Sequence, residues 1–100
     1  MNAVLVVDDD DDWRMLLSMC FEDAGFAVRS GRNVQEGIAA LTAGGSDVLV
    51  SDYVLPDGNG LDLLAGGRTA SLRYAALLTG MGTITPSDVK AAGFDAHYVK

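Results

Sequence analysis

Short runs of consecutive apolar residues alternate along this chain with longer segments in which apolar residues recur every three or four positions. The first run, Ala3–Val7, is rich in β-branched residues. Such a run is typical of a strand that is buried on both faces. Four similar runs predict further strands at residues 26–30, 47–51, 74–78 and 96–99.

The segments between these runs have the spacing and the capping residues of helices. After the first run, apolar residues at spacings of four, three and four mark one helix face: Trp13, Leu17, Cys20 and Ala24. Gly25 then provides a helix stop. Further helices are expected at residues 34–43, at 61–65, where two following glycines weaken the helix, and from Pro86 to the residue before Gly93. Residues 53–60 are rich in turn-forming residues and predict a loop.

Strands and helices therefore alternate from the first strand to the fifth. This order predicts an α/β fold in which one parallel sheet is covered by helices on both faces. One hundred residues correspond to a single domain, 1–100, which is expected to stop after the fifth strand. Ligands of such sheets bind beyond the carboxyl ends of the strands. Five polar side chains stand at those ends: Asp8, Asp9, Asp52, Thr79 and Lys100.

These five side chains are suited to phosphoryl chemistry. Carboxylates gathered in a cleft bind hard cations, and Mg²⁺ typically takes one or two of them together with phosphate oxygens. An aspartate beside such a cation can accept a phosphoryl group as a nucleophile. A hydroxyl and an ammonium group can then hold the phosphoryl oxygens.

Composition narrows the classes of function. The net charge of −7 argues against direct binding to nucleic acid, because proteins that bind the phosphate backbone are normally basic. A single cysteine, Cys20, excludes a disulfide within the chain, and we expect it in the core of a protein from the reducing cytoplasm. No apolar run reaches the length of a membrane span, and the first residues lack the basic region of a signal peptide.

Four sequence motifs, each at a predicted strand end, match one family. They are LVVDDD at 5–10, SDYVLPDGNG at 51–60, LLTG at 77–80 and AAGFDAHYVK at 91–100. With these motifs in this order, the whole chain resembles the receiver domain of bacterial two-component response regulators, the CheY-like superfamily. The resemblance implies a flavodoxin-like, three-layer fold with a five-stranded parallel sheet in the order 2-1-3-4-5. The fifth helix of that fold is absent from this chain.

The resemblance also implies a role for each residue of the site. Asp52 would be the phosphoacceptor, in a reaction that needs Mg²⁺. Asp8 and Asp9 would hold the Mg²⁺ together with Asp52 and the backbone carbonyl of Val54. Thr79 would be the switch hydroxyl and Lys100 the amine that binds the phosphoryl group. These roles are carried over onto matching residues of this sequence: Asp8, Asp9, Asp52, Val54, Thr79 and Lys100.

The implied partners follow from the same resemblance. The phosphodonor would be a sensor histidine kinase or a histidine phosphotransfer protein. The domain would be a signalling protein that assists its own phosphorylation and dephosphorylation, not an enzyme that turns over a separate substrate. The face formed by the helix after Thr85 and the last strand is a candidate homodimer surface, and no contact with nucleic acid or membrane is expected.

Other residues near the motifs leave alternatives open. His97 stands at the aromatic switch position and either rotates inward as Thr79 moves or is a half-exposed strand residue. Tyr98 is expected in the core and Tyr53 at the rim of the pocket. Two apolar residues, Val54 and Met81, stand where family members control the attack of water on the phosphoryl group.

The remaining aspartates of the run, residues 10–12, are expected to cap a helix and to face its positive N-terminal end.

The sequence argues against three alternative functions. A haloacid-dehalogenase-type phosphatase would use Asp8 as its nucleophile, but it needs threonine or valine four residues later, where this chain has Asp12. A degenerate receiver that works without phosphorylation would lack Asp52 or Lys100, and both are present. A calcium-binding loop fails because the required glycine and the distal glutamate are missing.

Overall fold

The computed structural model describes residues 2–80 and 84–100. Within these ranges, five parallel strands form one sheet in the order β2-β1-β3-β6-β7. The strands are β1 (Ala3–Val7), β2 (Ala27–Gly31), β3 (Val48–Asp52), β6 (Tyr74–Thr79) and β7 (Ala96–Val99). From β1 the chain adds β2 on one side and then crosses back to add β3, β6 and β7 on the other side. The predicted doubly wound topology is therefore confirmed.

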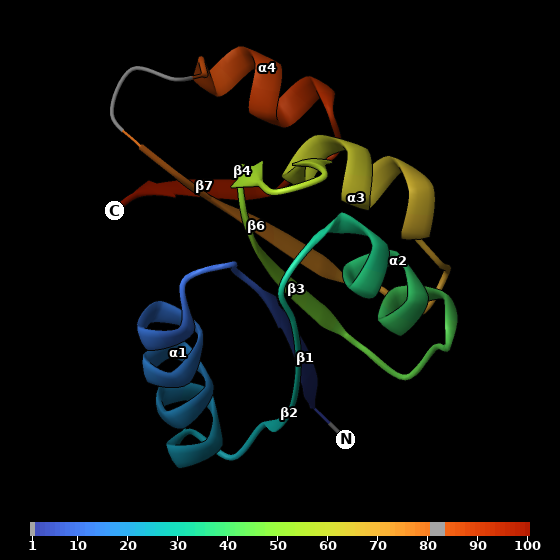
Figure 1. Cartoon of the computed structure of the whole chain (residues 1–100). Helices are drawn as coiled ribbons and strands as arrows, with labels where there is room; N and C mark the ends of the chain where they lie inside the picture. Colours follow the sequence, from blue (N-terminus) through green and yellow to red (C-terminus); the bar gives the residue numbers. More distant parts are fainter. Residues whose placement is uncertain (1, 81–83) are drawn as a thin grey trace.

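Helices cover the two faces of the sheet unequally. The described residues form α1 (Asp11–Asp23), α2 (Val34–Thr42), α3 (Gly60–Gly67) and α4 (Pro86–Ala91). In Figure 1, α1 lies on one side of the sheet and α2, α3 and α4 lie on the other. No helix in the described ranges is both long enough and apolar enough to cross a membrane.

Alternate residues of each strand point to opposite faces, and this divides the core into two clusters. On the side of α2, α3 and α4, strand residues such as Leu5, Leu49 and Leu77 pack with Leu63 and Val89. On the side of α1, the smaller cluster has Val4, Val6, Val50 and Leu78 as its buried members, and Leu17 and Phe21 pack against it.

The side of α1 carries an apolar groove of about 480 Å³. It is lined by residues of α1, of the sheet and of the segment before β2: Leu17, Phe21, Phe26, Val48, Val50, Tyr74, Ala76, Leu78 and Tyr98. No helix of the described residues lies over it. The prediction that Tyr98 belongs to the core is therefore wrong, since 57% of its surface is exposed.

The helix α1 packs on the sheet along a narrow line. Leu17 and Phe21 contact the core, but none of the residues of this helix is fully buried. Cys20 is exposed, so its predicted core position is wrong. Helical spacing grouped Cys20 with Leu17, whereas the observed contact follows Leu17 and Phe21, four residues apart.

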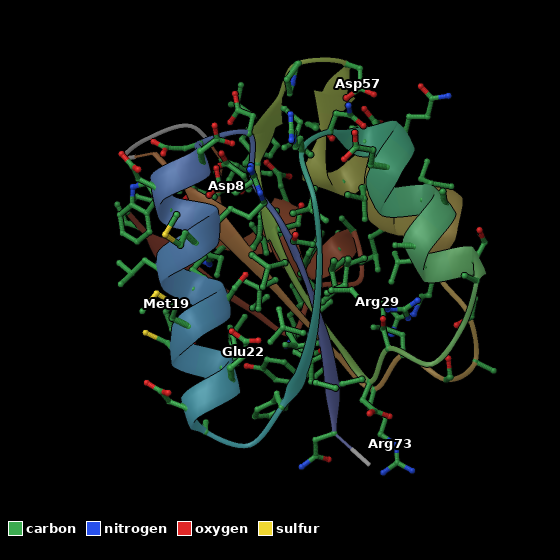
Figure 2. The ribbon with its side chains drawn as sticks, turned by 60° about the horizontal axis from the view of Figure 1, so that its bottom comes forward. Asp8, Met19, Glu22, Arg29, Asp57 and Arg73 are labelled. Carbon is green, nitrogen blue, oxygen red and sulfur yellow. The ribbon has the colours of Figure 1, made fainter. Side chains whose placement is uncertain are left out.

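The predicted loop at residues 53–60 contains a small antiparallel hairpin of β4 (Val54–Leu55) and β5 (Gly58–Asn59). Asp57, in the turn of the hairpin, accepts hydrogen bonds from the backbone amides of Val34 (2.7 Å) and Gln35 (3.0 Å). These bonds lower the pKa of Asp57. Figure 2 shows Asp57 beside the start of α2. The hairpin is thereby tied to a helix that the sequence pattern did not connect with it.

The third helix is longer than predicted. It continues through Gly66 and Gly67, although glycine destabilises a helix interior by about 1 kcal/mol relative to alanine. A Cβ at Gly66 would lie 2.8 Å from Cδ1 of Ile38, and a Cβ at Gly67 would lie 3.0 Å from Cδ1 of Leu41. At both glycines α3 packs closely on α2, and a Cβ there would require Ile38 or Leu41 to shift.

Candidate functional site

The carboxyl edge of the sheet brings together the polar residues that the sequence predicted for the site. Asp52 and Thr79 are the last residues of β3 and β6. Asp8 follows β1 directly, and Lys100 follows β7 directly. The backbone amide of Lys100 donates to the carbonyl oxygen of Thr79 at 2.9 Å. Parallel pairing thus places residues that are up to 92 positions apart in the chain at one edge.

Three carboxylates form the acidic centre of this edge. One oxygen each of Asp8, Asp9 and Asp52 lie within 4.8 Å of one another. Asp8 is fully buried, Asp9 is exposed, and the side chain of Asp52 is 13% exposed. Crowded, partly buried carboxylates with one side open to solvent are the ligand type and the geometry that suit a hard divalent cation such as Mg²⁺. The residues present therefore fit the predicted cation.

Lys100 is the positive charge of the site. Its Nζ donates to Oδ2 of Asp8 at 2.8 Å and to Oδ2 of Asp52 at 3.2 Å. Its side chain is 21% exposed, so both ion pairs are shielded from much of the solvent. The ammonium group therefore bridges two carboxylates from different strands.

The protonation equilibria of the site reflect this crowding. Burial is the largest influence on Asp52 and raises the pKa of its carboxyl group. The negative charges of Asp8 and Asp9 raise it further, and the contact with Lys100 opposes the rise without cancelling it. Burial alone would lower the pKa of Lys100, but the hydrogen bonds and charges of Asp8 and Asp52 outweigh burial and raise it.

The first turn of α1 explains the rest of the aspartate run. Asp10 is the N-cap, and its Oδ1 accepts from the backbone amides of Asp12 (2.9 Å) and Trp13 (3.2 Å). Asp11 pairs with Arg14, which lowers the pKa of Asp11. The predicted capping role of this segment is confirmed for Asp10, and none of residues 10–12 belongs to the three-carboxylate centre.

The first turn also holds the buried carboxylate in place. The backbone amide of Asp10 donates to Oδ1 of Asp8 at 3.0 Å, and Nη1 of Arg14 donates to the carbonyl oxygen of Asp8 at 2.8 Å. Figure 2 shows Asp8 beside the start of α1. Arg14 was not singled out in the sequence, because a lone arginine on a helix gives no signal of this contact.

Gly60 is a second contributor that the sequence pattern did not reveal. A Cβ at this position would lie 2.6 Å from the carbonyl oxygen of Asp52 and 2.6 Å from Cδ1 of Leu77. The backbone amide of Gly60 donates to the carbonyl oxygen of Tyr53 at 2.8 Å. Only a glycine lets the start of α3 approach the end of β3 this closely.

The remaining residues predicted for the site differ in how deeply they are buried. Thr79 is buried, and Val54 lies in β4 with 62% of its surface exposed. The ligand role of the Val54 carbonyl stays a prediction. Tyr53 lines a cavity of about 670 Å³ with residues of α3 and α4. Met81 lies outside the described residues.

His97 is half-buried on β7, in a small groove beside α4 that also includes Val89 and Phe94. This position is compatible with both roles predicted for it.

Comparison with known proteins identifies one family. The family model described as "Response regulator receiver domain" matches residues 4–93. The acid tolerance regulatory protein ActR of Rhizobium meliloti is 38% identical over 85 residues, which cover 83% of this chain and 43% of that protein. The response regulator protein PilR of Pseudomonas aeruginosa is 34% identical over 97 residues, which cover 94% of this chain and 22% of that protein. The chain therefore spans less than half the length of these two relatives.

Solved structures share the whole fold. The chemotaxis response regulator CheY4 of Vibrio cholerae has a TM-score of 0.87 at 28% identity, over 100% of this chain and 87% of that one. The response regulator protein TrrA of Thermotoga maritima, solved in complex with Mg²⁺ and BeF, has a TM-score of 0.86 at 26% identity, again over 100% and 87%.

The comparisons do not support the alternative of a haloacid-dehalogenase-type phosphatase. The structure adds a physical reason, since Asp8, the nucleophile of that alternative, is fully buried and bonded to Lys100.

Proposed function

This chain belongs to the receiver domain family of two-component response regulators, and on that premise we propose that Asp52 is its phosphoacceptor. The observation that carries the proposal is the position of Asp52 at the end of β3, within reach of both Asp8 and Lys100. The side chain of Asp52 is mostly buried, but 13% of its surface is exposed to solvent, so a donor can reach one carboxylate oxygen.

The proposed reaction is a phosphoryl transfer from a phosphohistidine. A carboxylate oxygen of Asp52 attacks the phosphorus, an O–P bond forms, and the N–P bond of the donor breaks. The imidazole nitrogen keeps the electron pair of the broken bond. The donor is a sensor histidine kinase or a histidine phosphotransfer protein. The role of this domain is then to carry a signal in the cytoplasm, and it promotes chemistry only on itself.

Four residues support the transfer. The carboxylates of Asp8 and Asp9, together with Asp52 and the carbonyl of Val54, would hold Mg²⁺. When bound, that cation neutralises negative charge on the phosphoryl oxygens. Lys100 would neutralise charge on the same oxygens, because its ammonium group lies 3.2 Å from the Asp52 carboxylate.

The proposed switch uses Thr79 and His97. Thr79 ends the strand next to β3, so its hydroxyl can turn toward phosphoryl oxygens on Asp52. His97 lies on the neighbouring strand β7, and it would respond to that movement. The groove beside α4 that includes His97 is then the surface that changes, and the surface of α4 and β7 stays a candidate for a homodimer.

The test is chemical labelling of the site. Incubation with acetyl phosphate and Mg²⁺ should add one phosphoryl group that is lost in strong base, as shown by intact mass. The variant Asp52→Asn should lose the label, because an amide oxygen is a poor nucleophile. The variant Asp11→Asn is the matched control and should keep the label, because Asp11 lies on the outside of α1. Full labelling of Asp52→Asn would disprove the assignment.

A further inference from the structure

The indole ring of Trp13 lies against the ammonium group of Lys100. The distance from Nζ to the ring centroid is 5.4 Å, which is within the range of a cation–π contact. Trp13 is 37% exposed, so its ring lies at the mouth of the site and not inside the core. This contact comes from α1, whereas the other two contacts of the ammonium group are with residues at the ends of β1 and β3.

The backbone of Trp13 is held by the same turn that holds the buried carboxylate. The backbone amide of Trp13 donates to Oδ1 of the N-cap Asp10 at 3.2 Å. The amide of Asp10 in turn donates to Asp8 at 3.0 Å. A short chain of hydrogen bonds thus links the backbone of Trp13 to the acidic centre.

Trp13 differs from the other exposed apolar residues of α1. Met15, Leu16 and Met19 are 61%, 53% and 54% exposed, and among the described residues the cation–π contact with Lys100 is made by Trp13. Trp13 is less exposed than these three and is the one that meets a cation of the site. Its placement is therefore not that of an ordinary surface side chain.

The lysine needs such support for a physical reason. A lysine ammonium sits on a flexible four-carbon stem, and holding that stem in one geometry costs side-chain entropy. Its two carboxylate partners, Asp8 and Asp52, are also the groups that a divalent cation and a phosphoryl group would engage. Among the described contacts of the ammonium group, the ring of Trp13 is one that neither a divalent cation nor a phosphoryl group would compete for.

We propose that Trp13 is a positioning residue that holds the Lys100 ammonium at the mouth of the acceptor site while the carboxylates change partners. The inference rests on the proposed function of Asp52, because it assigns Trp13 a part in that transfer. Removal of the ring should leave Asp52 reactive but let Lys100 spend more of its time in solvent. Half-exposed cation–π contacts correspond to about a twofold to fivefold change in an equilibrium or rate constant.

The first experiment does not require phosphorylation. In the metal-free protein, the ring current of Trp13 should shift the NMR signals of the Lys100 side-chain methylenes upfield. Trp13→Leu should return them to ordinary lysine values, and Trp13→Phe should keep part of the shift. Leu16→Ala, on the same helix, is the control and should leave them unchanged. Lysine signals without a ring-current shift in the wild type would overturn the proposal, even if Asp52 is labelled normally.

The second experiment measures coupling between the two residues during labelling by acetyl phosphate. Trp13→Leu should slow labelling about twofold to fivefold, and Trp13→Phe should restore most of the rate. In a Lys100→Ala background, Trp13→Leu should cause no further loss, because the ring then has no ammonium group to hold. Equal slowing in both backgrounds would show that Trp13 acts through folding or access, and the proposal would fail. Wild-type protein without any label would instead contradict the function of Asp52.

Discussion

Neutralising the acceptor carboxylate should make the protein more stable in the absence of metal. In Asp52→Asn, the side chain keeps nearly the same size and can still accept a hydrogen bond from Lys100, but the charge is gone. The wild-type residue is crowded by two other carboxylates whose oxygens lie within 4.8 Å. Its carboxyl pKa is raised, which shows that the site penalises the ionised form.

The magnitude follows from the distances. At an effective dielectric constant of about 20, two unit charges 4.8 Å apart repel by about 3.5 kcal/mol. Asp52 takes part in two such repulsions and in one attraction of about 5 kcal/mol with Lys100 at 3.2 Å. The repulsion with Asp9 is weakened by solvent because Asp9 is exposed. The net gain on removing the charge is therefore about 1 to 2 kcal/mol, or roughly 4–16 °C in Tm for a domain of this size.

The sign of the pH dependence is fixed by the direction of the pKa shift. The folded-state pKa of Asp52 lies above its unfolded value, so folding binds a proton between the two values and stability falls as pH rises through them. The destabilisation caused by the ionised Asp52 carboxylate is absent below the unfolded pKa of about 3.9 and reaches its full value above the folded pKa. The advantage of Asp52→Asn should thus be full at neutral pH and should disappear near pH 4.

Urea denaturation in EDTA at several pH values provides the measurement, with Trp13 fluorescence or circular dichroism as the signal. Asp12→Asn is a suitable control, because Asp12 is exposed in the first turn of α1 and outside the carboxylate centre. It should be neutral or slightly destabilising, since an acidic residue at a helix N-terminus is favourable. If Asp52→Asn is no more stable than wild type at pH 7, the crowding argument is refuted.

Three further outcomes are expected. Mg²⁺ at ten times its dissociation constant should stabilise the wild type by about 1.4 kcal/mol and change the fluorescence of Trp13, and no shift in melting temperature would contradict the cation site. Gly60→Ala should lower the free energy of unfolding by about 1–3 kcal/mol and slow labelling, because the added Cβ would push on Asp52 and Leu77. Unchanged stability and labelling would show that the backbone at residue 60 can move to make room for the Cβ. Val54→Asn should shorten the lifetime of the phosphoryl group, since a polar side chain beside Asp52 can orient water, and an unchanged decay of labelled protein after donor removal would exclude that role for residue 54.

The sequence predicted the sheet and the site because their signals are local and repeated. Each strand is a short apolar run, and each polar site residue stands at the end of one, so parallel pairing alone brings Asp8, Asp52 and Lys100 together. The capping role of Asp10 could also be predicted, because it depends only on the residues that follow it.

The features that the sequence did not predict depend on packing between distant elements. Cys20 and Tyr98 have side chains that are typical of a protein core, but their exposure is decided by what lies over one face of the sheet. Gly66 and Gly67 weaken a helix when considered alone and become favourable only against Ile38 and Leu41 of α2. The contact of Trp13 with Lys100 joins two residues with no relation in the sequence pattern.

The apolar groove beside α1 bears on how the protein behaves in concentrated solution. Tyr98 and Tyr74, which line this groove, are 57% and 41% exposed, so two copies that meet there can remove apolar area from water. The net charge of −7 opposes such contacts, and its repulsion is screened beyond about 10 Å at 0.1 M salt. Colloidal stability should therefore fall as salt is added or as pH approaches the pI of about 4.3. A dye that fluoresces on apolar surfaces should bind this groove in the folded state of residues 1–100, so its signal alone would not report their unfolding.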